Sequence, residues 1–509
     1  MRSVYIARNI ATTLFFQGLN IFVSLVSRKI FLVYLTIEYL GIDSLLSNIL
    51  FVFSLFEAGV ESSVTYSLYK PLAEGDNAKV ASLVAFLKKS YRIIGVSIFV
   101  AGLCFLPFVG VFFKGVGNIE HLNYYYLIFL LNTSVSYFFS YKRSIIIADQ
   151  KNYVVNSLHY LFVLPLRLVQ ILILVLTQSY MLFLLAMLAF TVFENYFIFR
   201  KAGKMYPFLD KVEKAKLELG DRVQLKKNMF GVLYTNVGVK LIDVSENLLI
   251  SFMFGTVWVG YYANYLIIIQ ALKAVTSQIY GATNSSFGNY VLSNRDTVGQ
   301  AFKTLNLFTS WMAAFTTIST FILINPVISL WLGKEYCLSA TVTLLICLNY
   351  FLSAFRRTTA LFRDAFGLFW RDKHKNICDL LVRVVLILVF AKFMGLAGVF
   401  LAGIVSTLFV GFAIEFFVVC KYGIEYPVLA YIKDIARSFA LTAFVGLLTY
   451  LPCSYFVFEN EIAGIAFKAL CCLLIPNLLF LAIFYNTEEF RFFKVRAGVG
   501  IKNLFSRGG

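Results

Sequence analysis

Polar side chains recur at helical spacing inside long apolar runs of this sequence. In the first run a polar residue returns every three or four positions, so one face of a helix would carry the whole set. That set is Asn9, Thr13, Gln17, Asn20, Ser24 and Arg28. Four later runs repeat the pattern, with Ser54, Glu57, Glu61 and Thr65; Asn156, Tyr160, Arg167 and Gln170; Asn236, Lys240, Asp243 and Asn247; and Gln270, Lys273, Ser277, Tyr280 and Asn284. Such stripes can bind a polar ligand within an otherwise apolar helix.

Apart from the basic residues that we assign to cytoplasmic segments and external loops, seven lie inside the apolar runs. They are Arg28, Lys29, Arg167, Lys240, Lys273, Arg383 and Lys468. A charge at the centre of a bilayer costs about 2.5–3.5 kcal/mol, so these faces should meet one another or water. The excess of cations indicates an anionic cargo, because a cavity for organic cations would favour acids and aromatic rings.

These patterns predict three groups of functional residues. Cargo anions should meet the cations Arg28, Lys29, Arg167, Lys240 and Lys273. Hydroxyl groups of the cargo should meet the amides Gln17, Asn20, Asn236, Asn247 and Gln270. A coupled proton or cation should bind at Glu57, Glu61 or Asp243.

Several of these charges also have a structural interpretation. Arg28, Lys29 and Lys468 could extend along the helix toward the membrane surface. Asp379 and Arg383 are four residues apart and could form an ion pair within one helix, and Lys240 could neutralise Asp243 in the same way.

The sequence offers little for catalysis or metal binding. It has no phosphate-binding loop of the G-x-x-x-x-G-K-[ST] type, which disfavours direct use of ATP. Its three histidines, His121, His159 and His374, lack the spacing of a metal site. The eight cysteines form no C-x-x-C pair and are interpreted as small apolar residues. We therefore expect no enzyme, no cofactor and no metal.

The composition explains where the stripes must lie. The chain has 509 residues, of which 60% are hydrophobic and 14% charged, with a mean hydropathy of +0.79. A soluble chain of this composition would leave far too much apolar surface in water, since soluble domains carry about 25% charged residues. A helix needs about 20 apolar residues to cross a bilayer. Fourteen spans follow from that length: 9–32, 41–68, 91–113, 123–147, 153–176, 179–199, 228–253, 257–286, 304–331, 338–361, 377–393, 395–420, 436–457 and 462–485.

The net charge of +18 is distributed as in a membrane protein rather than a nucleic-acid-binding one. With a cytoplasmic N-terminus, 35 of the 45 basic residues fall in cytoplasmic segments and three in external loops. Both termini are therefore predicted to be cytoplasmic. The longest loop, 201–227, should link an N-terminal six-helix bundle (1–200) to a second one (228–420), and 421–509 should add two helices and a basic tail. An even number of helices per half would make the halves parallel repeats, and Gly41 aligns with Gly260 in such a repeat.

Residues 8–76 resemble the Wzx-type polysaccharide repeat-unit flippases of bacteria, which belong to the multidrug/oligosaccharidyl-lipid/polysaccharide (MOP) exporter superfamily. The similarity rests on Glu57-Ala58-Gly59 and on Leu68-Tyr69-Lys70-Pro71 at the end of the second span, with weaker support from Ala148-Asp149-Gln150-Lys151. The resemblance implies an all-α integral membrane protein of about 14 transmembrane helices. It also implies two six-helix bundles in a V like that of multidrug (MATE) transporters, plus two C-terminal helices.

The resemblance further implies a function. The chain would flip undecaprenyl-pyrophosphate-linked oligosaccharide repeat units across the bacterial cytoplasmic membrane, for O-antigen or capsule synthesis, by alternating access through a cationic cavity. Its partners would be that cargo, membrane lipid and a coupling ion (H⁺ or Na⁺), with a polysaccharide polymerase as a further candidate and no nucleic acid. A lipid II flippase and a multidrug/cation antiporter of the same superfamily remain alternatives. A membrane glycosyltransferase is disfavoured by the short external loops, and a non-transporting scaffold would not need the polar stripes.

Overall fold

The computed structural model describes residues 2–113, 121–211, 217, 219–293, 298–368, 371–424, 427–456 and 458–491. These residues form helices and connecting turns, with no strand among them, which confirms the all-helical class. Nine of the described helices are long and apolar enough to cross a membrane by length and composition. The protein is accordingly a multi-pass membrane protein, and the predicted total of fourteen spans remains a prediction.

The chain forms two compact units, residues 1–260 and 261–509. The helices of the first unit are α1 (Arg2–Tyr34), α2 (Ile37–Glu74), α3 (Asn77–Phe105), α4 (Leu122–Ser140), α5 (Arg143–Ala148), α6 (Asn152–Thr177), α7 (Tyr180–Met205) and α8 (Leu219–Phe254), with 3₁₀ turns η1 (Leu106–Phe112) and η2 (Pro207–Lys211). Within this unit α2 packs on α3 and α8, α1 on α6, and α4 on α3 and α7.

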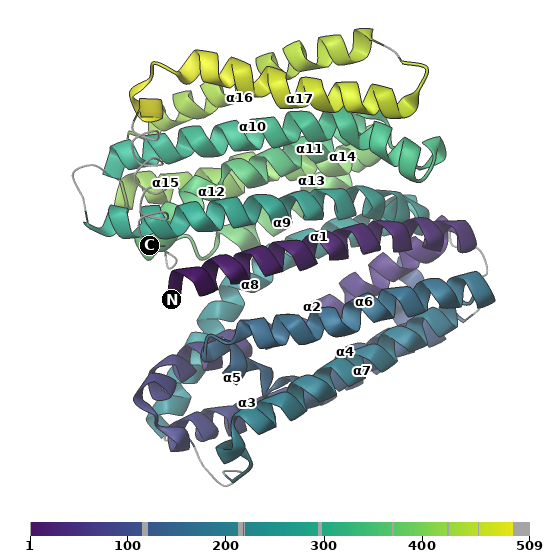
Figure 1. Cartoon of the computed structure of the whole chain (residues 1–509), viewed down its shortest axis with the longest axis vertical. Coiled ribbons are helices and arrows are strands. Elements are labelled where there is room, and N and C mark those ends of the chain that lie inside the picture. The colour runs from purple at the N-terminus through teal and green to yellow at the C-terminus, as the bar shows by residue number, and fades with distance from the viewer. Residues whose placement is uncertain are drawn as a thin grey trace. The chain divides into compact units, whose positions relative to one another are not determined.

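Helix α9 (Thr256–Ser293) begins in the first unit and continues into the second. The second unit then contains α10 (Val298–Trp331), η4 (Lys334–Tyr336), α11 (Ala340–Phe355), α12 (Arg357–Ala365), α13 (Lys375–Met394), α14 (Leu396–Ser406), η6 (Thr407–Phe412), α15 (Ala413–Tyr422), α16 (Val428–Tyr455) and α17 (Glu461–Phe484). Helices α16 and α17 pack on α10, as Figure 1 shows, and α13 packs on α14. The Trp311 indole of α10 donates a hydrogen bond to the Asn477 amide oxygen of α17 at 3.0 Å.

Local sequence signals set several helix ends. The side chains of Asp76, Ser179, Ser339 and Asn460 accept hydrogen bonds from backbone N–H groups in the first turns of α3, α7, α11 and α17. These bonds satisfy donors that a helix start leaves without a partner. Gly75 ends α2 with a φ of 73°, a conformation that glycine adopts without strain.

The fourth and tenth predicted spans end earlier than expected. Helix α4 stops at Ser140 and α11 at Phe355, and each is followed by a short separate helix, α5 or α12. A pair of basic residues stands at each break, Lys142-Arg143 and Arg356-Arg357. Apolar content had extended both spans across these pairs, although a basic pair is costly in the apolar layer. The predicted span 395–420 is continuous but contains the π-helical turn η6.

The order of helices repeats between the two halves of the chain. Three long helices of 33, 38 and 29 residues (α1–α3) correspond to three of 36, 38 and 34 residues (α8–α10). In each half a long helix and a short one follow, α4 and α5 or α11 and α12. The order agrees with a repeat of the two halves, and the parallel orientation of the copies stays a prediction.

A reciprocal contact inside the first unit agrees with this repeat. Gly41 is the fifth residue of α2 and lies against the backbone of Thr256, the first residue of α9. Gly260 is the fifth residue of α9, and a Cβ there would lie 2.6 Å from the carbonyl oxygen of Ile37, the first residue of α2. Equivalent positions thus exchange equivalent contacts, and both need glycine because the neighbour is backbone that no rotamer change can move.

Candidate functional site

Three helices of the first unit bring two arginines to one carboxylate. Arg28 of α1 and Arg167 of α6 both interact electrostatically with Asp43 of α2. All three side chains are half-buried. Two guanidinium groups share a single carboxylate, so the cluster keeps a net positive charge. We call Arg28, Asp43 and Arg167 the arginine cluster.

Hydrogen bonds hold part of the arginine cluster in place and leave part of it open. The Tyr180 hydroxyl donates to Asp43 Oδ1 at 3.1 Å, and Arg167 Nη1 donates to Gln170 Oε1 at 3.3 Å. Nη1 of Arg28 and Nε of Arg167 are sheltered from solvent and have no hydrogen-bond partner among the described residues. Guanidinium N–H groups bind carboxylate and phosphate oxygens strongly, so these donors suit an anionic ligand.

Aromatic packing fixes the hydroxyl that holds Asp43. The Tyr180 ring lies 5.1 Å from that of Tyr39 and 4.9 Å from that of Tyr125, and Phe31 meets it edge-on at 6.1 Å. Tyr180 itself is 2% exposed. The carboxylate is therefore positioned by a rigid partner, which limits how far it can follow either arginine.

The other predicted residues of α1 differ in exposure. Asn20 is half-buried, two turns from Arg28 on the same face, and its side-chain oxygen has no hydrogen-bond partner among the described residues. Gln17 is also half-buried, whereas Lys29 is exposed. The structure thus places Asn20 and Arg28 on one face and leaves Lys29 outside the arginine cluster.

The predicted residues of α8 are only partly described. Lys240 is exposed and its ammonium lies over the Phe51 ring of α2, 5.4 Å from the centroid. Asn247 is buried, and its side-chain oxygen has no hydrogen-bond partner among the described residues. The side chains of Asn236 and Asp243 lie outside the described residues, so the expected pairing of Lys240 with Asp243 stays a prediction.

The two predicted residues of α9 lie in the second unit. Lys273 and Gln270 are both exposed. They are three residues apart and share a helix face, as the spacing predicts.

The candidate coupling carboxylates lie on α2. Glu57 accepts a hydrogen bond from the Tyr137 hydroxyl of α4 at 2.7 Å, and its charge interacts with those of Glu61 and Arg143. Glu57 and Glu61 are half-buried. Two neighbouring carboxylates repel each other when both are charged, and a single basic neighbour offsets only one of them. Such a pair can therefore take up and release one proton or cation.

A buried ionic network lies in the second unit and joins α12, α13 and α15. Arg356 donates two hydrogen bonds to Glu415, at 3.0 and 2.6 Å, and Lys375 lies 3.0 Å from Asp372 and 3.3 Å from Glu415. Arg363 bridges Asp372 and Glu415 at 3.2 and 3.4 Å. Burial alone would lower the pKa of Arg363, but the neighbouring carboxylates raise it above its usual value. Arg363 also pairs with Asp364 at 2.7 Å, so three cations face three carboxylates and the network has a structural role.

Arg383 is engaged in a similar way between α13 and α14. It lies 3.8 Å from Asp379, four residues earlier, and donates to the Thr407 hydroxyl at 2.7 Å, while Ser406 donates to Asp379. The structural interpretation of Arg383 is the one that this geometry supports.

The motif Ala148-Asp149-Gln150-Lys151 forms the turn between α5 and α6. Asp149 accepts a hydrogen bond from the Tyr206 hydroxyl at 2.6 Å and pairs with Lys151 at 2.6 Å. Partial burial would raise the pKa of Asp149, but these two hydrogen bonds outweigh burial and lower it. The motif therefore ties the start of α6 to the end of α7.

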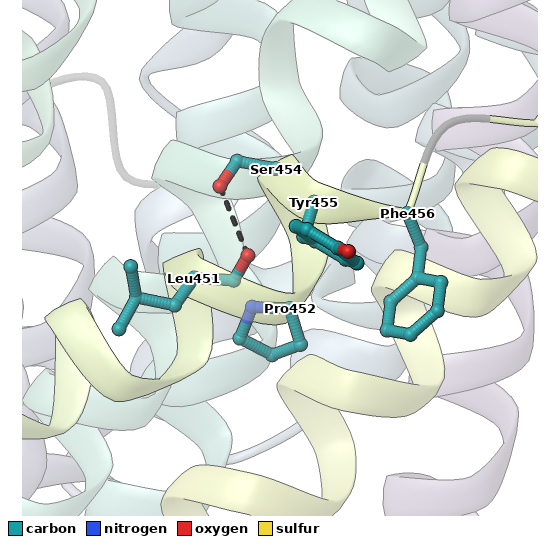
Figure 2. A pocket seen from close by; sticks show the side chains of 5 residues that line it. All are labelled: Leu451, Pro452, Ser454, Tyr455 and Phe456. Carbon is teal, nitrogen blue, oxygen red and sulfur yellow. Dashed lines mark hydrogen bonds between the residues drawn. The ribbon is translucent and has the colours of Figure 1, made fainter.

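An open depression of about 520 Å³ lies at the end of α16, and Figure 2 shows the side chains that line it. It is lined by Leu451, Pro452, Ser454, Tyr455 and Phe456, and the Ser454 hydroxyl donates to the Leu451 carbonyl at 2.9 Å. Its lining contains no charged residue, so it is distinct from the predicted cationic site.

Comparison with known proteins places the fold in a class. No family model matches the sequence, and no curated protein matches it. The structure, however, shares its all-helical fold with solved membrane transporters. It is similar to that of the lipid II flippase MurJ in an inward closed conformation, with a TM-score of 0.70 and 17% identity over 94% of this chain and 99% of that one. It is also similar to an inward-facing MATE multidrug resistance transporter, with a TM-score of 0.63 and 13% identity over 78% of this chain and 94% of that one.

Sequence reasoning missed two members of the site. Asp43 and Tyr180 lie at the ends of their apolar runs and extend no polar stripe. The available signal for Asp43 was that it is an acid near the start of an otherwise apolar span. Its two partners lie 15 residues before it and 124 residues after it, so their meeting depends on tertiary packing.

Proposed function

We propose that this protein is a flippase for undecaprenyl-pyrophosphate-linked oligosaccharide repeat units in the bacterial cytoplasmic membrane. The observation that carries the proposal is the arginine cluster, with two guanidinium groups for one carboxylate and N–H donors without partners. A diphosphate supplies the oxygens that such donors bind. The fold shared with MurJ and MATE transporters supports transport by alternating access.

In this mechanism the diphosphate meets Arg28 and Arg167, and further cations at Lys29, Lys240 and Lys273 attract acidic groups of the cargo. The amides of Gln17, Asn20, Asn236, Asn247 and Gln270 bind sugar hydroxyls. Glu57, Glu61 or Asp243 takes the coupling proton or cation. Both termini lie in the cytoplasm, and a polysaccharide polymerase is a candidate partner.

Lipid II flipping is the second candidate, because the solved structure of a lipid II flippase covers 94% of this chain. Lipid II carries the same polyprenyl diphosphate, so the arginine cluster would serve either cargo. An antiporter for organic cations is disfavoured by the net positive charge of that cluster.

Expression in two kinds of strain separates these functions. In strains that lack their own repeat-unit flippase, the chain should lower the accumulated lipid-linked oligosaccharide and restore surface polymer. In a strain depleted of its lipid II flippase, growth should not be rescued. The proposal would be refuted, and lipid II flipping favoured, if the chain rescued growth of the depleted strain but restored surface polymer in none of several strains with different repeat units. Membrane abundance measured in each strain serves as the control.

A further inference from the structure

The two halves of the chain place a tyrosine and an arginine in corresponding positions, with different neighbours. In the first unit Tyr137 lies near the end of α4, before the break that precedes α5, and Arg143 follows six residues later. In the second unit Tyr350 precedes Arg357, the first residue of α12, by seven residues. Each arginine thus begins the short helix of its own unit.

The first unit neutralises its arginine internally. The Tyr137 hydroxyl donates to Glu57, and the charge of Arg143 interacts with the same carboxylate. The tyrosine and the arginine therefore already share an anion supplied by the chain.

With Gly41 aligned to Gly260, the second unit has Thr276 at the position of Glu57 and Tyr280 at the position of Glu61, so it lacks both carboxylates. The guanidinium of Arg357 lies over the Tyr280 ring of α9, 5.6 Å from its centroid, and interacts electrostatically with Tyr350. Arg357 is exposed and forms no ion pair with any residue that the structure describes. Arg357 is therefore positioned by Tyr280 and Tyr350, but no carboxylate of the described residues balances its charge.

A buried donor completes the arrangement. Tyr280 is 4% exposed, and its hydroxyl has no hydrogen-bond partner within the described part of the chain. Burying a hydroxyl without a partner is unfavourable, so a ligand that accepts its hydrogen bond would stabilise the site. Tyr350, in contrast, already donates to Thr316 at 3.2 Å.

We propose that Arg357 and Tyr280, with Tyr350 beside them, form a phosphate-binding site in the second unit. The guanidinium supplies charge and paired N–H donors, and the Tyr280 hydroxyl supplies a further donor. The ligand is the diphosphate of the lipid-linked cargo, and this identification rests on the proposed function. The same chemistry could come from the headgroup of an anionic phospholipid, and the test distinguishes the two.

The test measures binding, not transport. The purified full-length protein in zwitterionic-lipid nanodiscs is titrated with geranylgeranyl diphosphate, and the dissociation constant is compared among variants. Arg357→Gln should weaken binding about tenfold or more, since a charge-assisted hydrogen bond contributes about 1.5–3 kcal/mol. Tyr280→Phe, which keeps the ring under the guanidinium, should weaken it several-fold.

The matched control is Arg371→Gln. Arg371 is also exposed and also lies over a ring, that of Tyr422, at 3.7 Å, so its loss should leave the dissociation constant unchanged. Equal binding by wild type and Arg357→Gln, or no binding by wild type, overturns the phosphate site. In a further titration, phosphatidylglycerol replaces part of the nanodisc lipid. If the wild type then no longer binds geranylgeranyl diphosphate, the Arg357 site is assigned to phospholipid and the cargo assignment is overturned.

The strain assays then separate this inference from the proposed function. If wild type restores polymer and Arg357→Gln restores it equally with unchanged diphosphate affinity, only the site is refuted. If wild type binds diphosphate through Arg357 but restores polymer in no strain, the site stands and the repeat-unit function falls.

Discussion

Replacing Gly260 by alanine tests the close crossing of α2 and α9 at their first turns. A Cβ at Gly260 would lie 2.6 Å from the Ile37 carbonyl oxygen, whereas ordinary contact begins at 3.4 Å, so the two atoms would be 0.8 Å too close. Overpacking of this kind costs about 1–3 kcal/mol when the neighbour cannot rotate away. The cost is partly masked, because alanine gains about 1 kcal/mol over glycine in a helix interior.

A second glycine removes that ambiguity. Gly18 lies within α1 and has nothing within 4 Å of its Cβ position. Gly18→Ala should therefore show the helix gain alone, and the difference between the two variants should equal the full overpacking cost of about 1–3 kcal/mol. Gly41→Ala, which meets the backbone of Thr256, should behave like Gly260→Ala.

Thermal unfolding in detergent measures the difference. A thiol-reactive fluorogenic dye reports unfolding, because all eight cysteines are free and unfolding exposes the buried ones to the dye. The four buried cysteines are Cys347, Cys420, Cys453 and Cys472. Gly260→Ala should melt several degrees below Gly18→Ala. If Gly260→Ala melts at or above the temperature of Gly18→Ala, the tight crossing does not exist and the reciprocal contact is wrong.

Three further predictions follow from the charged groups. Arg167→Gln and Lys273→Gln should each abolish polymer export in the flippase-deficient strain at unchanged membrane abundance, and normal export in both would refute the cationic cavity. Asp149→Asn should destabilise the protein at pH 7 by up to about 1 kcal/mol, a value reduced for solvent screening. The folded pKa of Asp149 lies below its ordinary value, so this contribution is complete above about pH 4 and is lost as the pH falls through the folded pKa. The melting temperatures of the wild type and of Asp149→Asn should therefore converge in acid. A difference between them that persists in acid would contradict the pairing of Asp149 with Lys151 and Tyr206. Glu415→Gln should lower stability by about 3–5 kcal/mol, because three basic groups would lose their shared buried partner; a change below 1 kcal/mol would show that the network contributes little.

The sequence predicted the features that depend on local spacing. Apolar runs of about 20 residues placed the long helices, since the bilayer requires that length whatever the surroundings. The period of 3.6 residues put Asn20 and Arg28 on one face, and the alignment of Gly41 with Gly260 anticipated two positions that contact corresponding helix starts. A count of apolar residues did not locate the breaks at Ser140 and Phe355, because it averages over the whole span and so passes across a single basic pair.

Only the tertiary structure decided which charges meet. Periodicity orients a side chain on its own helix but does not say which helix lies opposite, so Asp43 as the shared partner of Arg28 and Arg167 was beyond the sequence. The same limit applies to Arg357, which belongs to none of the predicted polar stripes and which the structure sets over the buried ring of Tyr280. Helix formation is governed by neighbours three or four residues away, whereas the pairing of charges depends on packing between segments far apart in the chain.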